Sequence, residues 1–384
     1  MNNAATTSAA SPDAAHQSRK TNALVVAHVD EQRGMRGGEQ QAAWLVNGLA
    51  AQGVTNILVG RPGEAFVNME TPGFETVRCA LPLRGELDLY SAWRLARFVN
   101  RYGVDILHAH ASHAHGLAVL AKQFGARCRV VVSRRVNFMP RKHLLNRWKY
   151  TQADRILCVS EKVAETLGAY GLEPPQVCVV HSAVDPERAM MPPVARDALG
   201  VPETAPLLVS AGSLVDHKDH ANLLEAAALV RTQIPDIQVC IAGDGPLRAS
   251  LEAKRKALGL ASCVHFLGYR TDAPAITRAA DVYVSSSWSE GLGTSILEAL
   301  AAGVPVVAAE AGGAREMVIP GETGFLTPVR DPQALAKAII ASLRDRDQAR
   351  RMAEAGQRRA LEMFSVTRMV ARTLATYKEL LGRS

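Results

Sequence analysis

The sequence predicts two doubly wound α/β domains, and three observations lead to this fold class. Short apolar runs rich in β-branched residues alternate with segments of helical spacing, as in parallel sheets covered by helices on both faces. The length of 384 residues suits two or three domains. A proline-rich stretch without periodicity, 185–206, divides the alternating segments into two series. Two such domains leave a cleft between them, and their ligands bind beyond the carboxyl ends of the strands.

The first series runs to about residue 180. Six apolar runs predict strands at 23–29, 56–59, 104–109, 129–133, 155–159 and 177–180. Helical spacing predicts helices at 39–52, 88–102, 112–124 and 161–167. Gly53 closes the first of these helices, and Ser160 is the expected N-cap of the last.

The second series repeats the alternation. Strands are expected at 206–211, 237–242, 263–266, 281–285 and 304–307, with helical stretches between them. The last segment, 364–381, carries apolar residues at the spacing of an amphipathic helix.

The composition excludes several classes of protein. A hydrophobic fraction of 48% and a charged fraction of 21% rule out global disorder. The net charge of +7 permits anionic partners without identifying one. No run of 18 apolar residues occurs, which argues against a transmembrane helix. Residues 1–20 lack the apolar centre of a signal peptide and are expected to form a disordered tail.

The six cysteines are far apart and form no CxxC pair. Most of them lie in apolar, strand-like runs, which predicts buried free thiols in a reducing compartment.

The most informative stretch is the loop at 285–299, between a strand and a helix that begins near Thr294. Gly291 and Gly293 let backbone N–H groups approach a ligand, and a helix N-terminus favours negative charge. The stretch therefore suits a diphosphate. Glu290 and Glu298 could accept hydrogen bonds from sugar hydroxyls on either side of it. The structural alternative for Glu298 is a capping box with Ser295.

Glu290 and Glu298, in EGLGTSILEALAAGVPVVAAEAGGAREMV, resemble the motif of the family 4 glycosyltransferases of the GT-B fold. Other blocks agree in order and spacing, and these are GGE at 37–39, DILHAH at 105–110, CVSEKV near Ser160, VVHSAVD at 179–185 and AGDGP at 242–246. The resemblance runs from about residue 22 to the C-terminus.

The resemblance implies two Rossmann-like domains that face each other across a deep cleft. The N-terminal, acceptor-side domain would span 21–188 and be completed by the C-terminal helix at 365–384. The C-terminal domain, 189–364, would bind the nucleotide sugar. The implied reaction is transfer of a hexose-type sugar with retention of configuration, from a UDP-sugar first and a GDP-sugar second. No metal or other cofactor is expected.

The resemblance also assigns roles to single residues. Glu290 would hold the transferred sugar, Glu298 the ribose, and backbone near Tyr269 and Arg270 the base. Gly38 ends a glycine-rich loop expected beside the donor phosphate and the acceptor. The expected contacts to the diphosphate or sugar come from Gly291, Leu292, Gly293, Thr294 and Ser295.

Lys218 follows a strand in the segment AGSLVDHKDH. An ammonium group there can neutralise the diphosphate and stabilise the leaving group. Most relatives have Arg where this chain has Ser213, so His217 or another base would have to supply the missing charge. The alternative for Lys218 is a solvated loop lysine.

Four histidines, His108, His110, His113 and His115, fall within eight residues. Imidazole is a common metal ligand, but no nearby Asp or Cys completes a known ligand spacing. His110 matches the family's histidine at a strand end, facing the donor sugar, and joins Glu290 and Lys218 as an expected catalytic residue. A histidine that merely ends a strand is the alternative.

A basic segment extends from 127 to 155, with nine Lys or Arg and one acid. Within it, the stretch from Arg141 to Tyr150 mixes bases with apolar residues, which suits a helix on an anionic membrane or an anionic acceptor. A solvated helix face is the alternative. A nucleic-acid partner fits poorly, because aromatic residues are few and no recognition motif is present. The DRD sequence at 345–347 is interpreted as a solvated face and not as a metal motif.

The resulting hypothesis is a retaining, metal-independent glycosyltransferase. Its expected acceptor is an envelope glycan or a lipid-linked sugar, such as lipopolysaccharide core. Its expected location is the cytoplasm, at the inner face of the membrane. A nucleotide-sugar epimerase on the same fold is one alternative. A non-catalytic sugar-binding protein is another, kept open by Ser213 and Ala183, where relatives often have Arg and Gly.

Overall fold

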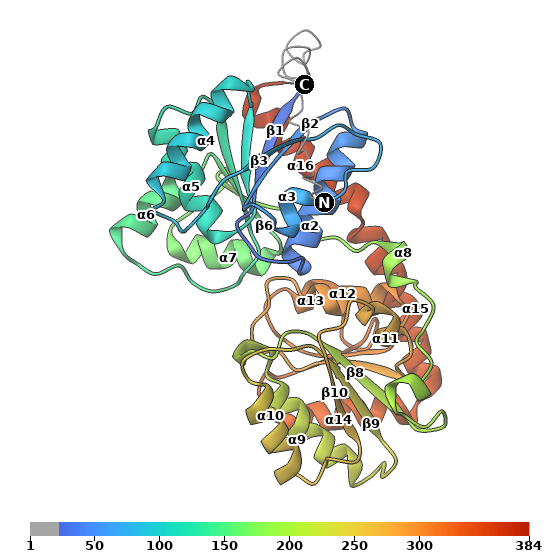
Figure 1. Cartoon of the computed structure of the whole chain (residues 1–384). Helices are drawn as coiled ribbons and strands as arrows, with labels where there is room; N and C mark the ends of the chain where they lie inside the picture. Colours follow the sequence, from blue (N-terminus) through green and yellow to red (C-terminus); the bar gives the residue numbers. More distant parts are fainter. Residues whose placement is uncertain (1–22, 384) are drawn as a thin grey trace, which may run out of the picture.

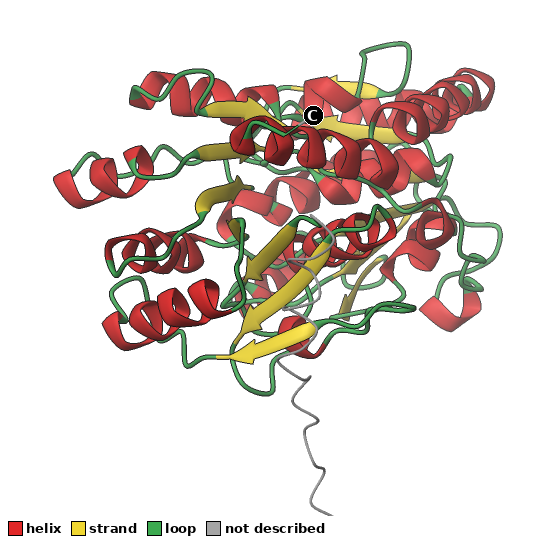
Figure 2. Cartoon of the chain, turned by 90° about the horizontal axis from the view of Figure 1, so that it is seen from above, coloured by secondary structure: helices red, strands yellow, loops and turns green. Residues whose placement is uncertain are grey.

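The computed structural model describes residues 23–383, which form two parallel β-sheets, each flanked by helices (Figure 1). The tail expected at 1–20 lies outside the described residues. A view at right angles shows helices on both sides of the strands (Figure 2). The predicted fold class, two doubly wound α/β domains, is therefore confirmed.

The first sheet has seven strands in the order β3-β2-β1-β4-β5-β6-β7. Its strands are β1 (Val25–Val29), β2 (Thr55–Gly60), β3 (Val77–Ala80), β4 (Ile106–Ala109), β5 (Arg129–Arg134), β6 (Arg155–Cys158) and β7 (Val177–Val179). The helices of this half are α2 (Gly37–Ala51), α3 (Ala65–Asn68), α4 (Leu89–Arg101), α5 (Ser112–Gln123), α6 (Leu144–Thr151), α7 (Glu161–Tyr170) and α8 (Pro186–Ala189). Ser160 caps α7 as predicted, because its side chain accepts a hydrogen bond from Val163 N.

The second sheet has six strands in the order β10-β9-β8-β11-β12-β13. Its strands are β8 (Leu207–Ala211), β9 (Gln238–Ala242), β10 (Val264–Gly268), β11 (Val282–Ser285), β12 (Val306–Ala309) and β13 (Phe325–Thr327). Its helices are α9 (His220–Arg231), α10 (Arg248–Ala257), α11 (Ala273–Arg278), α12 (Thr294–Ala301), α13 (Ala314–Met317), α14 (Pro332–Arg344) and α15 (Arg346–Met363). Helix α16 (Val366–Leu381) follows α15. Two short 3-10 turns, η1 (Asp197–Leu199) and η2 (Asp216–Lys218), flank β8.

Each sheet reverses its strand order once, between β1 and β4 in the first and between β8 and β11 in the second. Ligands of open α/β sheets bind at such points, beyond the carboxyl ends of the strands. The segments that follow these four strands carry Gly38, His110, Lys218 and Glu290. The topology thus places four predicted site residues at the two switch points.

Helix α16 returns to the first sheet and packs beside α2, so the two ends of the described chain lie in the same half (Figure 1). Its Met369, Val370 and Tyr377 are buried in one cluster with Val26 and Leu49. Gly48 allows the close approach, because a Cβ atom there would lie 2.4 Å from Val370 Cγ2.

Some features differ from the sequence prediction. Strands β3 and β13 were not predicted, because β3 contains Arg78 and no buried residue, and β13 has only three residues. All six cysteines are free, but Cys79, Cys128 and Cys178 are half-buried instead of buried. Among the described residues, no helix combines the length and the apolar character needed to cross a membrane.

Candidate active site

The loops after β8 and β11 are tied together by hydrogen bonds. Ser286 Oγ donates to Lys218 O at 3.0 Å, and Trp288 N donates to His217 O at 2.9 Å. The Trp288 indole N–H donates to Asp216 O at 3.0 Å. Because strands β8 and β11 are neighbours, these bonds hold the two loops against each other at the switch point.

Lys218 and Glu290 form an ion pair at this position. Lys218 Nζ lies 2.5 Å from Glu290 Oε1, and Ser287 Oγ donates to the same oxygen at 2.7 Å. The side chains retain only 19% and 10% exposure, so Lys218 is not a freely solvated loop lysine. The structure thus joins two of the predicted catalytic residues, with a cation and a carboxylate side by side.

Helix α12 begins directly after this loop, at Thr294. Its N-cap is Gly293, whose φ of 101° is left-handed, and no side chain caps the helix. The capping box considered for Ser295 and Glu298 is therefore wrong, since the helix begins two residues before a box would require. An uncapped N-terminus leaves backbone N–H groups of Gly293, Thr294 and Ser295 for an anion.

The glycine-rich loop after β1 meets this helix end from the other half of the molecule. A Cβ atom at Gly37 would lie 3.3 Å from Thr294 Oγ1. Gly37 and Gly38 are the first residues of α2, so two helix N-termini converge here. Both ends favour negative charge, which suits a phosphate group between them.

The two halves also touch through the backbone of Gly291. Ser160 Oγ donates to Gly291 O at 2.8 Å. A Cβ atom at Gly291 would lie 2.0 Å from Arg135 O, so only glycine fits this contact. Leu292 beside it is buried in the core. The glycines of the motif therefore serve the contact between the halves as well as access for a ligand.

Glu298 has a partner that the sequence analysis missed. Arg188 Nε, on α8, donates to Glu298 Oε1 at 3.3 Å. Burial raises the pKa of Glu298, and the Arg188 guanidinium opposes that rise. The Glu298 side chain retains 24% exposure, which leaves its carboxylate accessible beside the start of α12.

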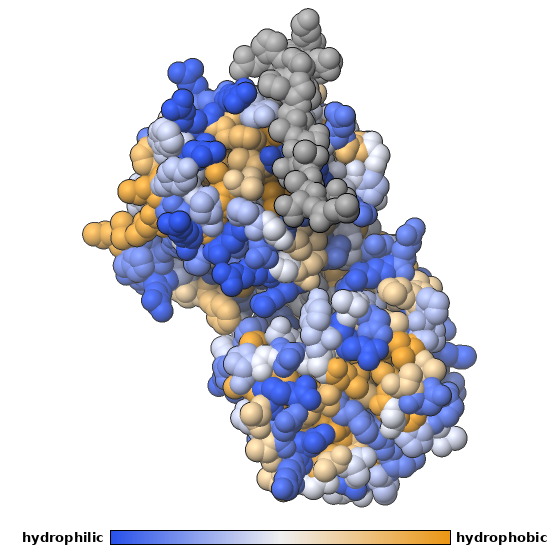
Figure 3. All heavy atoms as spheres, in the orientation of Figure 1, coloured by the Kyte–Doolittle hydropathy of each residue, from blue (hydrophilic) through white to orange (hydrophobic). Residues whose placement is uncertain are grey.

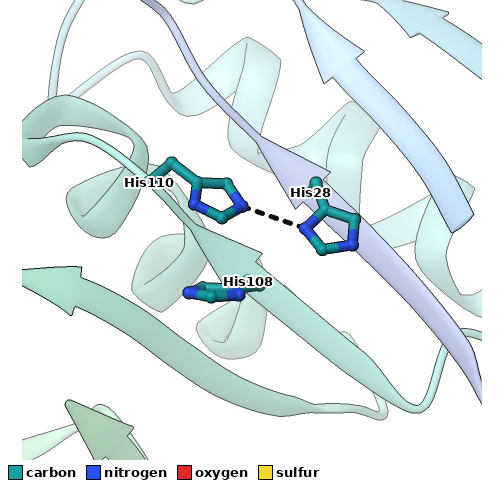
Figure 4. A group of neighbouring side chains, drawn as sticks. All are labelled: His28, His108 and His110. Atoms are coloured by element: carbon teal, nitrogen blue, oxygen red, sulfur yellow. Dashed lines mark hydrogen bonds between the residues drawn. The ribbon is translucent and has the colours of Figure 1, made fainter. Parts of the chain in front are cut away.

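His110 follows β4 and is buried, with both ring nitrogens in hydrogen bonds. His28 Nδ1 lies 2.9 Å from His110 Nε2 (Figure 4). Arg135 Nη2 lies 3.3 Å from His110 Nδ1. Burial lowers the pKa of His110 well below its usual range, so the imidazole is neutral. The parallel register explains the gathering, because His28 on β1 pairs with His108 on β4, two residues before His110.

His28, His108 and His110 bring one ring nitrogen each within 4.8 Å of one another, a group that could offer three ligands to a metal ion (Figure 4). All six ring nitrogens already have protein partners; those of His108 are Tyr377 Oη at 2.5 Å and Ser133 Oγ at 2.9 Å. His113 and His115 do not belong to the group. His113 lies on the surface of α5 and His115 bonds to Lys149 O.

The remaining predicted residues lie around the switch points. Ser213 is exposed in the loop after β8 that carries Lys218. Tyr269 and Arg270 follow the edge strand β10, two strands away from β8. Tyr269 is 68% exposed, and Arg270 forms a bidentate pair with Asp272 at 2.6 and 2.7 Å. The contact between this backbone and a base stays a prediction.

Arg135, His28 and Ser287 join Arg188 as site residues that the sequence analysis did not assign. Arg135 follows β5, and its Cδ lies 3.6 Å from where a Cβ of Gly38 would be. A basic residue at a strand's carboxyl end was the one signal that pointed to it. His28 and Ser287 lay within apolar or serine-rich runs and carried no such signal.

The DRD sequence at 345–347 lies at the start of α15. Asp345 is the N-cap of that helix, since it accepts a hydrogen bond from Gln348 N at 2.9 Å. Asp345, Arg346 and Asp347 are all exposed, in agreement with a solvated face.

An apolar surface with basic residues lies beside α6, and we call it the α6 surface. Its exposed apolar residues are Leu87, Leu89, Leu144, Leu145 and Trp148. Exposed bases surround them, and these are Arg84, Arg141, Lys142 and Arg147. A cavity of about 780 Å³ between α4, α5 and α6 is lined by Leu87, Leu89, Leu145, Trp148 and others. Figure 3 shows hydrophobic surface protruding at the left edge of the upper half, where Figure 1 places α6.

Comparison with known families covers most of the chain. Residues 193–359 match the model described as glycosyl transferases group 1, and residues 35–188 match the model described as Glycosyltransferase Family 4. The chain is 30% identical over 296 residues to the putative glycosyltransferase EpsD of Bacillus subtilis, covering 72% of this chain and 77% of that protein.

Two further comparisons cover nearly the whole length. The lipopolysaccharide core biosynthesis glycosyltransferase LpsE of Rhizobium meliloti is 29% identical over 330 residues, 86% of this chain and 92% of LpsE. The crystal structure of Anabaena HepE in complex with UDP and glucose superposes with a TM-score of 0.80 at 21% identity, over 93% of this chain and 100% of HepE. Sequence motifs, topology and comparisons agree, and the chain belongs to the family 4 glycosyltransferases of the GT-B fold.

Proposed function

We propose that this glycosyltransferase moves a hexose-type sugar from a nucleotide sugar to a cell-envelope glycan or a lipid-linked acceptor such as lipopolysaccharide core. A UDP-sugar is the favoured donor and a GDP-sugar the second. The observation that carries the proposal is the Lys218–Glu290 pair beside the uncapped N-terminus of α12. A cation and a helix end suit a diphosphate, and a carboxylate suits the hydroxyls of the sugar attached to it.

The proposed reaction retains the configuration of the transferred sugar. The acceptor oxygen bonds to the anomeric carbon on the face from which the diphosphate leaves, while the bond between that carbon and the diphosphate oxygen breaks. The proton of the acceptor hydroxyl passes to the leaving diphosphate. Lys218 and the helix N-terminus stabilise the charge that develops on the diphosphate, so no metal is required. Glu290 positions the sugar and does not attack it.

Two relatives support the choice of substrates. HepE was crystallised with UDP and glucose, which favours a UDP-sugar as donor. LpsE is named for lipopolysaccharide core biosynthesis, which favours an envelope acceptor. The α6 surface supports contact with an anionic membrane, since apolar side chains surrounded by bases favour binding to anionic lipid. We place the enzyme at the cytoplasmic face of that membrane.

Thermal stabilisation tests the donor site. The wild-type chain is heated with UDP, GDP, ADP and common UDP- and GDP-sugars, all in EDTA. A ligand at 100 times its Kd is expected to stabilise the fold by about 2.7 kcal/mol. Stabilisation by UDP and one UDP-sugar, lost in Lys218→Met, would support the proposal. Stabilisation only when a divalent metal replaces EDTA would contradict metal independence, and no stabilisation by any nucleotide would contradict the donor site.

A further inference from the structure

A chain of four buried or partly buried side chains runs from the interior of the first sheet to the junction between the halves. Asn56 Nδ2 donates to Val46 O at 3.0 Å, and Asn56 Oδ1 lies 3.0 Å from His28 Nε2. His28 Nδ1 lies 2.9 Å from His110 Nε2, and His110 Nδ1 lies 3.3 Å from Arg135 Nη2.

The two ends of this chain determine where every proton lies. A guanidinium only donates, so His110 Nδ1 must accept and the proton of neutral His110 is on Nε2. His110 Nε2–H then donates to His28 Nδ1, which leaves the proton of His28 on Nε2. At the other end, the carbonyl of Val46 only accepts, so the Asn56 amide must turn its oxygen toward His28. Both ends require the same arrangement.

The environment keeps the two imidazoles neutral. Burial lowers the pKa of His28 to about 4 and that of His110 well below its usual range. The rings of His28 and His110 lie edge to edge and nearly parallel, with centroids 5.2 Å apart and an interplanar angle of 15°. A second proton on His28 would place two N–H donors face to face between the rings. A second proton on His110 would place an N–H donor opposite the Arg135 guanidinium, which is also a donor. The hydrogen bonds of this series therefore all point the same way, from Arg135 as first donor to Val46 O as last acceptor.

We infer that Asn56 and His28 are positioning residues, which hold His110 with its proton on Nε2 and its Nδ1 lone pair toward Arg135, and so orient the guanidinium at the junction of the two halves. Arg135 there lies next to Gly38 and Gly291, between the glycine-rich loop and the Glu290 loop. The catalytic consequence depends on the proposed function, whereas the protonation pattern does not.

Nuclear magnetic resonance of the full chain, labelled with 15N, tests the protonation pattern without any substrate. Protonated and unprotonated ring nitrogens differ widely in 15N shift. We expect His28 and His110 both to carry their proton on Nε2, with signals assigned by single substitutions. A proton on Nδ1 of His110, or rapid exchange between the two nitrogens, would overturn the inference.

A matched pair of variants tests the positioning role. Gln at position 28 has one acceptor and one donor and can bridge His110 and Asn56, whereas Leu fills a similar volume and offers neither. We expect UDP release from the most stabilising UDP-sugar to fall by at least about tenfold in kcat in His28→Leu, with KM changed less than threefold. His28→Gln should stay within threefold of wild type. Equal losses in the two variants, or full activity in His28→Leu, would overturn the inference.

A zinc ion bound by His28, His108 and His110 is the alternative to the hydrogen bonds between these side chains. Wild-type chain and His108→Asn are titrated with Zn²⁺, and the metal content of the purified protein is measured. One tightly bound zinc per wild-type chain, lost in His108→Asn, would overturn the hydrogen-bonded chain in favour of a three-histidine metal site. If no nucleotide sugar binds, the proposed function fails, but the protonation pattern is still decided by the spectrum.

Discussion

Lys218 Nζ lies 2.5 Å from Glu290 Oε1, although 72 residues separate the two along the chain. In the absence of a ligand the cation and the carboxylate neutralise each other. Both would exchange partners when a donor binds, Lys218 for the diphosphate and Glu290 for sugar hydroxyls. The ion pair therefore keeps two partly buried charges compensated in the empty site.

Replacing Glu290 with Gln tests its role toward the sugar. The amide still accepts hydrogen bonds from Lys218 and Ser287 but carries no charge. We expect the transfer rate to fall by about a hundredfold or more, while UDP still stabilises the fold. Turnover is measured as UDP release. The control is Glu173→Gln, an exposed carboxylate outside the site. Wild-type turnover in Glu290→Gln would contradict the role.

Restoring an arginine at position 213 tests whether the site lacks one positive charge. Ser213 is exposed in the same loop as Lys218, so a longer side chain has room toward the diphosphate. We expect Ser213→Arg to tighten UDP binding by about tenfold, roughly 1.4 kcal/mol. The gain should shrink in 0.5 M salt, because exposed charges are screened. Calorimetric titration measures both, and Ala261→Arg adds the same charge at an exposed position elsewhere. A gain in both variants, or in neither, would argue against a missing charge at position 213.

Asp30, at the end of β1, makes stability depend on pH. Asp30 is 1% exposed, and burial raises its pKa to about 7. A carboxyl with a higher pKa in the folded state costs stability as the pH rises from about 4, its unfolded pKa, to about 7. We expect Asp30→Asn to be more stable than wild type at pH 8, by roughly 4 kcal/mol at most, and to lose this advantage toward pH 4.

Unfolding of Asp30→Asn and wild type is followed by denaturant and by heat at pH 4, 6 and 8. The exposed Asp236→Asn serves as the control and should show no such dependence. An advantage of Asp30→Asn that stays constant across the range would show that a contact, and not the ionisation of Asp30, is responsible.

Charge on the α6 surface tests the membrane contact. Leu144 is 86% and Leu145 is 65% exposed, so Glu at both positions should not disturb the core. We expect the double variant to bind vesicles rich in phosphatidylglycerol at least about tenfold more weakly than wild type, because it loses apolar contact and gains repulsion. Sedimentation with vesicles measures this. Leu229→Glu, exposed on α9 in the other half, is the control. Equal binding by all three proteins would contradict a membrane contact through α6.

Most of the fold could be predicted from local pattern. Strands buried on both faces are nearly continuous apolar runs, and eleven of the thirteen described strands, β1, β4, β8 and β11 among them, were found within a few residues. Helical spacing located α2 and α5 in the same way. The edge strands β3 and β13 were missed, although the edge strands β7 and β10 were found. No residue of β3 is buried, and β13 has three residues of which only Thr327 is buried, so neither shows a continuous apolar run.

The candidate site was predictable where a motif lies in one segment. The sequence predicted an anion site at the strand ends from the glycines near 291, the two glutamates and Lys218. What the sequence left open was their partners. Whether Glu298 caps its own helix or meets Arg188 depends on where α12 begins and on the path of α8.

The amino-acid sequence by itself determined the alternation of strands and helices and the two sheets, and it predicted an anion site in the loop after residue 285. Only the tertiary structure decided that Lys218 pairs with Glu290, and that Asn56, His28, His110 and Arg135 form one hydrogen-bonded chain. The physical reason is that burial periodicity is local along the chain. These contacts instead arise from the strand order, which brings β1, β2, β4 and β5 side by side from segments more than one hundred residues apart along the chain.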